Sequence, residues 1–125
     1  MSASSEKLEN VEFDHTLWLL ELKFALKEMS IYENRILHLI AIREKEQTEP
    51  LGDLIMEFLE HRHVSNNLKK TIKKHIENMQ NNINANGQLD KIINEGHDKV
   101  RARMEDYRAA YSALKDQFHR SIATS

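Results

Sequence analysis

The chain has 125 residues, 40% hydrophobic and 30% charged, with a net charge of −2 and no cysteine. This length indicates one domain that can bury a core without disulfides. The lack of cysteine excludes thiolate nucleophiles, cysteine-based zinc sites and iron–sulfur clusters. The near-neutral charge gives no general attraction to nucleic acid, so no nucleic-acid partner is expected. The first residues are polar and no apolar run nears the roughly 18 residues of a membrane span, so we expect a cytoplasmic protein.

The first twelve residues are rich in serine and charge, which predicts a flexible segment before a single helical domain at 13–122. The first helix is predicted over 13–46. It carries an apolar seam with steps of four and three residues, formed by Trp18, Leu22, Ala25, Met29, Tyr32, Ile36 and Leu39. This spacing averages 3.5 residues, which places the seam on one side of a helix.

A second apolar stripe lies on another face of this helix and contains Leu17, Leu20, Phe24 and Ile31. A helix that is apolar over most of its circumference is normally buried over most of it. Either the rest of the chain or a second copy can cover the stripe. We expect a homodimer that forms through these four residues.

Two breaks divide the rest of the chain into two more helices, predicted over 51–84 and 88–122. Thr48 and Pro50 suit a helix start, and an asparagine-rich turn ending at Gly87 suits a helix end. Three segments of similar length joined by short turns predict an all-α fold. The expected architecture is a long antiparallel up-down-up three-helix bundle that resembles a coiled coil.

The seams of the later helices are interrupted at two places. Between Glu60 and Asn67 the second helix either contains a polar layer or kinks near Ser65, and the lack of Gly and Pro favours a continuous helix. In the third helix, two successive steps of four around Gly96 resemble a stutter. Gly96 either lets a neighbour approach closely or marks a weak point.

Seven histidines raise the question of a metal site. Matching the helices at their turns places His75, His97, Glu21 and Asp98 at one level, where imidazole and carboxylate groups could hold zinc or iron. In this register Glu21 and His75 flank the seam, which favours solvated histidines. We therefore predict no metal and no cofactor, and these four residues stand as candidates for the alternative.

A polar layer is expected where Arg62 meets Glu33 and Tyr111 in the antiparallel register. An Arg62–Glu33 ion pair with Tyr111 as a hydrogen-bond partner would fix the register of the helices.

Four lysines within Lys69–Lys74 form a basic cluster, and Glu77 follows closely. Because no aromatic or arginine readers accompany the cluster, a solvated helix face is the favoured interpretation.

Two stretches carry a resemblance to known proteins. They are Trp18–Phe24 continuing to Tyr32–Ile36, and His97–Glu105 with Tyr111, Leu114 and Phe118–Arg120. In pattern they are similar to a family of short bacterial all-helical proteins without an assigned activity. The resemblance implies an all-helical fold and a bacterial cytoplasmic setting, and it carries over no functional residue.

No phosphate-binding loop, buried carboxylate pair or Ser–His–Asp order can be assigned in the sequence. The sequence therefore predicts a non-enzymatic helical interaction or scaffold protein that acts through self-association and apolar helix faces. One alternative is a metal-binding bundle that uses histidines and carboxylates. The other is weak binding of nucleic acid or an anionic surface through Lys69–Lys74.

Overall fold

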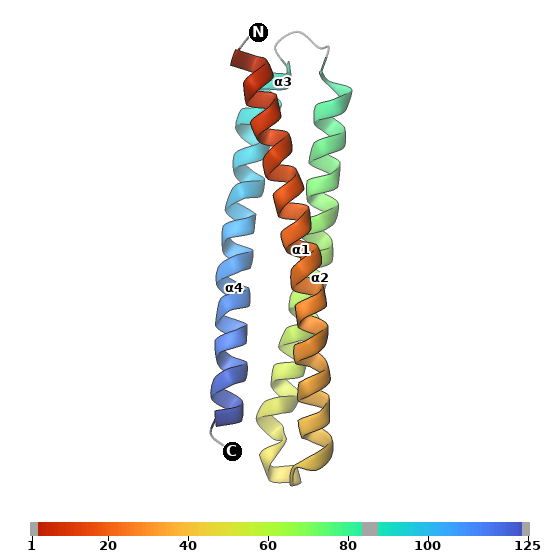
Figure 1. Ribbon diagram of the computed structural model, residues 1–125, viewed down its shortest axis with the longest axis vertical. Coiled ribbons are helices and arrows are strands. Elements are labelled where there is room, and N and C mark those ends of the chain that lie inside the picture. Colours follow the sequence, from red (N-terminus) through yellow and green to blue (C-terminus); the bar gives the residue numbers. More distant parts are fainter. Residues whose placement is uncertain (1–2, 84–87, 124–125) are drawn as a thin grey trace.

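The computed structural model describes residues 3–83 and 88–123, which form one elongated up-down-up bundle of three helical segments (Figure 1). The first is α1 (Ala3–Ile42), and a short 3-10 turn, η1 (Lys45–Gln47), leads into α2 (Glu49–Asn81). The third consists of α3 (Gln88–Ile92), the π-helical turn η2 (Ile93–His97) and α4 (Asp98–Ala123). The predicted all-α bundle is confirmed.

α1 begins ten residues earlier than the sequence predicts and ends at Ile42 instead of residue 46. The segment over 1–12, which the sequence predicts to be flexible, is α-helical from Ala3 onward. Leu8 and Val11 pack against Met79 and Ile93 at the end of the bundle that holds α3. These apolar contacts outweigh the polar composition of the segment, because a helix in a bundle is stabilised mainly by packing of its apolar face.

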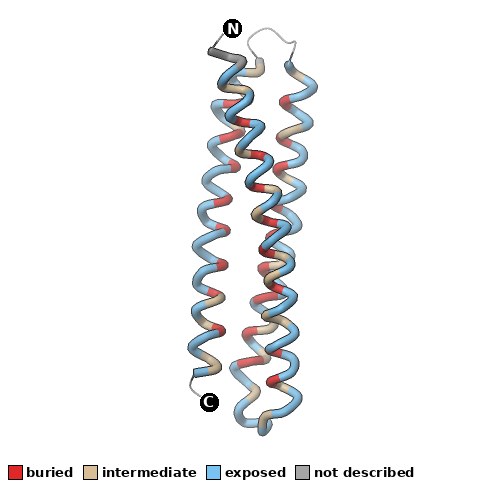
Figure 2. Tube along the Cα trace, in the orientation of Figure 1, coloured by how far each residue is buried: buried red, intermediate tan, exposed pale blue. Residues whose placement is uncertain are grey.

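The predicted seam of α1 faces the interior of the bundle (Figure 2). Of its seven residues only Tyr32 is partly buried and the others are buried. The seam of α2 consists of Leu51, Leu54, Phe58, His61, Ser65, Leu68, Ile72, His75 and Met79. A single core cluster joins both seams to the buried face of α4.

α2 passes through Ser65 as one continuous helix, as predicted. Ser65 is fully buried, and its hydroxyl donates to the backbone carbonyl of His61 at 2.9 Å. The hydroxyl also forms a 2.7 Å hydrogen bond with the phenol of Tyr107 on α4. The interruption of the apolar pattern is therefore a buried polar layer in which Ser65 and Tyr107 are hydrogen-bonded to each other, while Nε2 of His61 has no partner.

The stutter expected around Gly96 is a π-helical turn, η2. A π-helical turn inserts one extra residue into the helical repeat, so it changes which residues of the segment face the core. Here Ile93, His97 and Val100 are buried. The asparagine-rich turn that the sequence predicts to end at Gly87 falls partly on residues 84–87, which lie outside the described residues.

α1 and α4 run parallel and are joined by ion pairs seven residues apart. Asp14 pairs with Arg101, Glu21 with Arg108 and Glu28 with Lys115, and in each pair the second residue follows the first by 87 positions. All three pairs correspond to the same axial position of the two helices relative to each other. Over the described ranges, no helix is both long and apolar enough to cross a membrane.

The second apolar stripe of α1 is exposed. Leu17, Leu20, Phe24 and Ile31 have between 46% and 71% of their surface accessible to solvent, and Phe13 extends the stripe at 63%. The described part of the chain therefore does not cover the stripe, so the first of the two alternatives is not found there. Covering by a second copy stays a prediction.

Candidate metal centre

Three buried histidines meet in the core near the end of the bundle that holds α3. His15 comes from α1, His75 from α2, and His97 is the last residue of η2. A ring nitrogen of each histidine lies within 4.8 Å of a ring nitrogen of each of the other two. The ring centroids are 5.1 Å apart for His15–His75 and for His15–His97, and 5.8 Å apart for His75–His97. Each helical segment thus contributes one imidazole to a single point.

Each of these rings has one buried nitrogen without a hydrogen-bond partner. The atoms are Nε2 of His15, Nε2 of His75 and Nδ1 of His97. A buried polar atom without a partner costs about 1–3 kcal/mol, so such atoms are rare in folded proteins. Three of them together form a set of nitrogen atoms that are suited to coordinate a metal ion and have no hydrogen-bond partner in the protein.

Asp14 orients the ring of His97. Oδ2 of Asp14 lies 3.0 Å from Nε2 of His97, and Arg101 reaches the same oxygen at 3.3 Å. A carboxylate only accepts, so Nε2 of His97 carries the proton and a neutral His97 has its lone pair on the buried Nδ1. A carboxylate behind a histidine is the usual support of a metal-binding imidazole.

Burial and charge favour the neutral forms of His15 and His75. Burial, together with the charges of His75 and His97, lowers the pKa of His15 to about 4, against a partial opposing effect of Asp14. Burial and the charge of His97 also lower the pKa of His75. Burial would raise the pKa of Asp14, but its contacts with His97 and Arg101 outweigh burial and lower it. Neutral imidazole is the form that binds metals, so the rings of His15 and His75 are ready for coordination near pH 7.

Packing holds the three rings in place. The ring of Trp18 stacks on His97 with centroids 4.6 Å apart, and it lies 5.8 Å from His15. Gly96 gives room to His75, since a Cβ atom at Gly96 would lie 2.8 Å from Cε1 of that ring. The close approach of a neighbour is thus the correct one of the two roles considered for Gly96.

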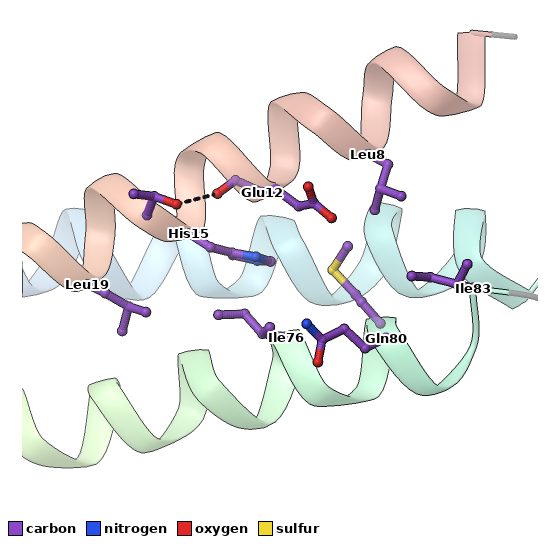
Figure 3. A pocket seen from close by; sticks show the side chains of 9 residues that line it. Leu8, Glu12, His15, Leu19, Ile76, Gln80 and Ile83 are labelled. Atoms are coloured by element: carbon purple, nitrogen blue, oxygen red, sulfur yellow. Dashed lines mark hydrogen bonds between the residues drawn. The ribbon is translucent and has the colours of Figure 1, made fainter. Parts of the chain in front are cut away.

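Two hollows reach the cluster from the surface. The first, of about 200 Å³, lies between α1 and α2, and His15 forms part of its wall with Leu19 and Ile76 (Figure 3). The second, of about 650 Å³, lies between α2 and the third segment, and it is lined by His75, Gly96 and the cations Lys74, Lys99 and Arg103. Each hollow gives a small ion a short route to one of the three rings.

The structure brings together two of the four residues that the sequence named for the metal alternative. His75 and His97 join the cluster, whereas Glu21 pairs with Arg108 at 2.8 Å and Asp98 pairs with Arg101 at 2.9 Å. In the described ranges no carboxylate joins the three nitrogens as a fourth member. The convergence of Glu21 and Asp98 with the histidines, which the metal alternative required, is not found, because arginines on the surface of α4 hold both. The favoured interpretation of solvated histidines is wrong for His75 and His97, because both are buried.

His15 was missed, although a signal for it exists in the sequence. Continuing the seam of α1 from Trp18 toward the N-terminus in steps of three and four gives His15, Val11 and Leu8. The sequence also favours Ile76 and Gly96 as seam positions, whereas the structure buries the neighbouring residues His75 and His97. An error of one position on two helices thus placed His75 and His97 beside the seam, although the sequence names both as candidates.

The predicted polar layer is partly present. Arg62 pairs with Glu33 as expected, with Nη2 at 2.6 Å and Nε at 3.1 Å from the two carboxylate oxygens. Tyr111 does not join this pair, because its hydroxyl donates to Glu28 at 2.7 Å. Burial and this acidic neighbour raise the pKa of Tyr111.

The lysines of Lys69–Lys74 are all exposed.

Comparisons of the chain with protein-family models, with curated proteins and with solved structures find no match. The site therefore has to be interpreted from its own geometry: three buried imidazoles, three unpartnered nitrogens and one supporting carboxylate.

Proposed function

We propose that this protein binds a divalent transition metal ion through His15, His75 and His97. The observation that carries the proposal is the meeting of three buried imidazoles, each with one buried nitrogen that lacks a hydrogen-bond partner and each with a ring nitrogen within 4.8 Å of the other two. A single metal ion satisfies all three at once. Packing alone offers no such compensation for three buried acceptors.

The donor set limits the kind of metal. Imidazole nitrogen suits zinc, copper, iron and nickel, whereas calcium and magnesium prefer oxygen ligands. Ligands at about 2.1 Å in a tetrahedral site are about 3.4 Å apart, so nitrogens that lie within 4.8 Å of one another need to close by at most about 1.4 Å. Three histidines also leave a fourth coordination position for water or another small ligand, as in zinc sites that bind substrates.

The direct test is a metal titration of untagged protein from which metal has been removed with a chelator. We expect one Zn²⁺ per chain, and Co²⁺ is expected to give the intense visible absorption of a tetrahedral site. His15→Leu and His75→Leu are expected to abolish this absorption while the protein keeps its helical circular dichroism. His63→Gln is the matched control, since His63 is exposed on α2. A protein that binds no metal, or binds equally well in both leucine variants, would exclude the centre.

A second candidate function is the non-enzymatic interaction role expected from the sequence. It is supported by the exposure of Leu17, Leu20, Phe24 and Ile31 on one face of α1. Continuous apolar patches of this kind mark protein–protein contacts. A homodimer would cover them, and sedimentation velocity over a range of concentrations tests it. The resemblance to short bacterial helical proteins supports a bacterial cytoplasmic setting for either function.

A further inference from the structure

We propose that two copies of this chain pair through α1 in an antiparallel orientation, with a two-fold axis between Leu20 and Phe24. The proposal rests on the second candidate function above and specifies the geometry of that self-association. It is independent of the metal centre, because the exposed stripe and the histidine cluster lie on different faces of α1.

The exposed stripe has the spacing of a coiled-coil seam. Phe13, Leu17, Leu20, Phe24 and Ile31 follow one another at steps of four, three, four and seven residues, and Lys27 occupies the position that the last step omits. Steps of four and three keep a stripe straight along a two-stranded coiled coil. The stripe therefore suits another helix as its partner.

The area of the stripe matches what a dimer needs. Each of its five large apolar residues has between 46% and 71% of its surface exposed. At roughly 100 Å² of exposed surface for each, the stripe offers about 500 Å² per chain, and a pair of chains buries about 1,000 Å². That total reaches the lower bound of specific protein interfaces, and 500 Å² lies within the range of the largest apolar patch on a typical monomer, which is often functional.

The pattern is its own complement when the second helix runs in the opposite direction. About a two-fold axis at residue 22, Phe13 lies opposite Ile31 of the other copy, Leu20 opposite Phe24, and Leu17 opposite Lys27. The alkyl stem of Lys27 then covers Leu17 while its ammonium group reaches water. A parallel pair in register instead places Lys27 against Lys27 inside the apolar seam, where like charges repel each other.

A hollow beside Phe24 provides a place for the side chains of the second copy. It has about 220 Å³, lies in the groove between α1 and α4, and Ala25 and Tyr107 are part of its wall. Leu20 of the second copy lies opposite Phe24 in the antiparallel arrangement and can enter this hollow. The interface then extends beyond the stripe to the rim of α4.

The first part of the test is sedimentation velocity on metal-free protein up to about 100 µM, which corresponds to weak but specific association. We expect a dimer for the natural chain and a monomer with unchanged circular dichroism for Leu20→Glu and Phe24→Glu. Leu59→Glu is the matched control, since Leu59 is 46% exposed, as is Leu17 of the stripe, but lies on α2. This variant is expected to stay dimeric. A monomeric natural chain overturns self-association, and a dimer that persists in Phe24→Glu overturns this face.

The second part determines the orientation, and the lack of cysteine in the chain makes it simple. Thr16 and Ser30 flank the stripe on the same side, and both donate to carbonyl groups of their own helix. In the antiparallel pair, Thr16 of one copy is next to Ser30 of the other. We expect a mixture of Thr16→Cys and Ser30→Cys proteins to form the mixed disulfide under mild oxidation. A dimer in which Thr16→Cys links mainly to itself overturns the antiparallel arrangement while self-association stands. Ser30 also accepts a hydrogen bond from Arg62, which keeps its pair with Glu33 in the variant.

Discussion

At the scale of single residues, Gly96 and Asp14 determine the shape of the histidine cluster without being ligands themselves. Gly96 leaves the space that the ring of His75 occupies, and Asp14 holds the proton-bearing nitrogen of His97. Neither residue has a metal-binding atom within the group of three nitrogens. Substituting either residue therefore changes the geometry of the site and leaves its three donor nitrogens in the chain.

Substitution of Gly96 by alanine is expected to displace the ring of His75. The added Cβ would lie 2.8 Å from Cε1 and 2.9 Å from Nδ1 of that ring, so the ring has to move. We expect metal affinity to fall by at least about tenfold, which corresponds to 1.4 kcal/mol, although alanine is the better helix former. Gly52→Ala is the control, because nothing lies within 4 Å of its Cβ, and it should raise the free energy of unfolding by about 0.5–1 kcal/mol. Equal metal affinities of the two variants, measured by chelator competition, would contradict the close packing of His75.

Substitution of Asp14 by asparagine keeps the size of the side chain but removes the charge behind His97. Loss of a carboxylate that supports a metal-binding histidine typically weakens metal binding by 10–100-fold, and we expect a decrease in this range. Competition with a chromophoric zinc chelator measures it. Glu9→Gln, at an exposed position of α1 that lines neither hollow, serves as the control and should leave the affinity unchanged. An unchanged affinity in Asp14→Asn would mean that the carboxylate has no part in the site.

At the scale of elements, the ladder between α1 and α4 repeats every seven residues. Its acids, Asp14, Glu21 and Glu28, all lie on one flank of the α1 seam, and each faces a cation on α4. Because the two helices run parallel, each step advances by the same amount on both. Arg101 also pairs with Asp98 of its own helix, so this arginine makes both an intrahelical and an interhelical ion pair.

Substitution of Glu21 by glutamine distinguishes a rung of this ladder from a metal ligand. Glu21 accepts two hydrogen bonds of 2.8 Å from Arg108, and both side chains are more than a third exposed. Exposed pairs of this kind contribute at most about 1 kcal/mol, so urea unfolding should change by that amount or less. The metal content per chain should stay the same. Loss of metal in this variant would reinstate Glu21 as a ligand and contradict the three-histidine centre.

At the scale of the whole molecule, the buried histidines make folding sensitive to acid. Burial lowers the pKa of His15 to about 4, and it also lowers the pKa of His61 and His75. The usual value in an unfolded chain is about 6.5. Between these two values the unfolded chain binds a proton that the folded chain does not. Stability is therefore complete above pH 6.5 and is lost as the pH falls toward 4.

For metal-free protein we expect the free energy of unfolding to fall between pH 7 and pH 5. His15 alone accounts for a decrease of about 2 kcal/mol over this interval, by the linkage between proton binding and folding. Urea unfolding followed by circular dichroism at the two pH values measures the total. In His15→Leu the decrease should be smaller by that share. The same pH dependence in both proteins would show that His15 is not buried in its neutral form.

The sequence by itself determined the helical class and most of the core. Apolar residues at a period of 3.5, with Pro50 as the single proline, leave few alternatives to long helices that pack through one face, and the buried seam of α1 follows this pattern. The Arg62–Glu33 pair was also predictable, since its two residues lie only 29 positions apart across the single turn that joins α1 and α2, and their relative level depends on that turn alone. Local spacing is sufficient for such features, because they do not depend on how far one helix slides along another.

Only the tertiary structure decided which residues share a level at the other end of the bundle. A seam that repeats every seven residues looks the same after a shift of one repeat, so the pattern cannot fix the start of α1 or place His15 beside His75 and His97. The packing of Leu8 and Val11 on Met79 and Ile93 fixes this level. The extra residue of the π-helical turn then rotates His97 into the core. The histidine cluster is thus a product of helix register, which depends on the summed packing of all layers and not on any one segment.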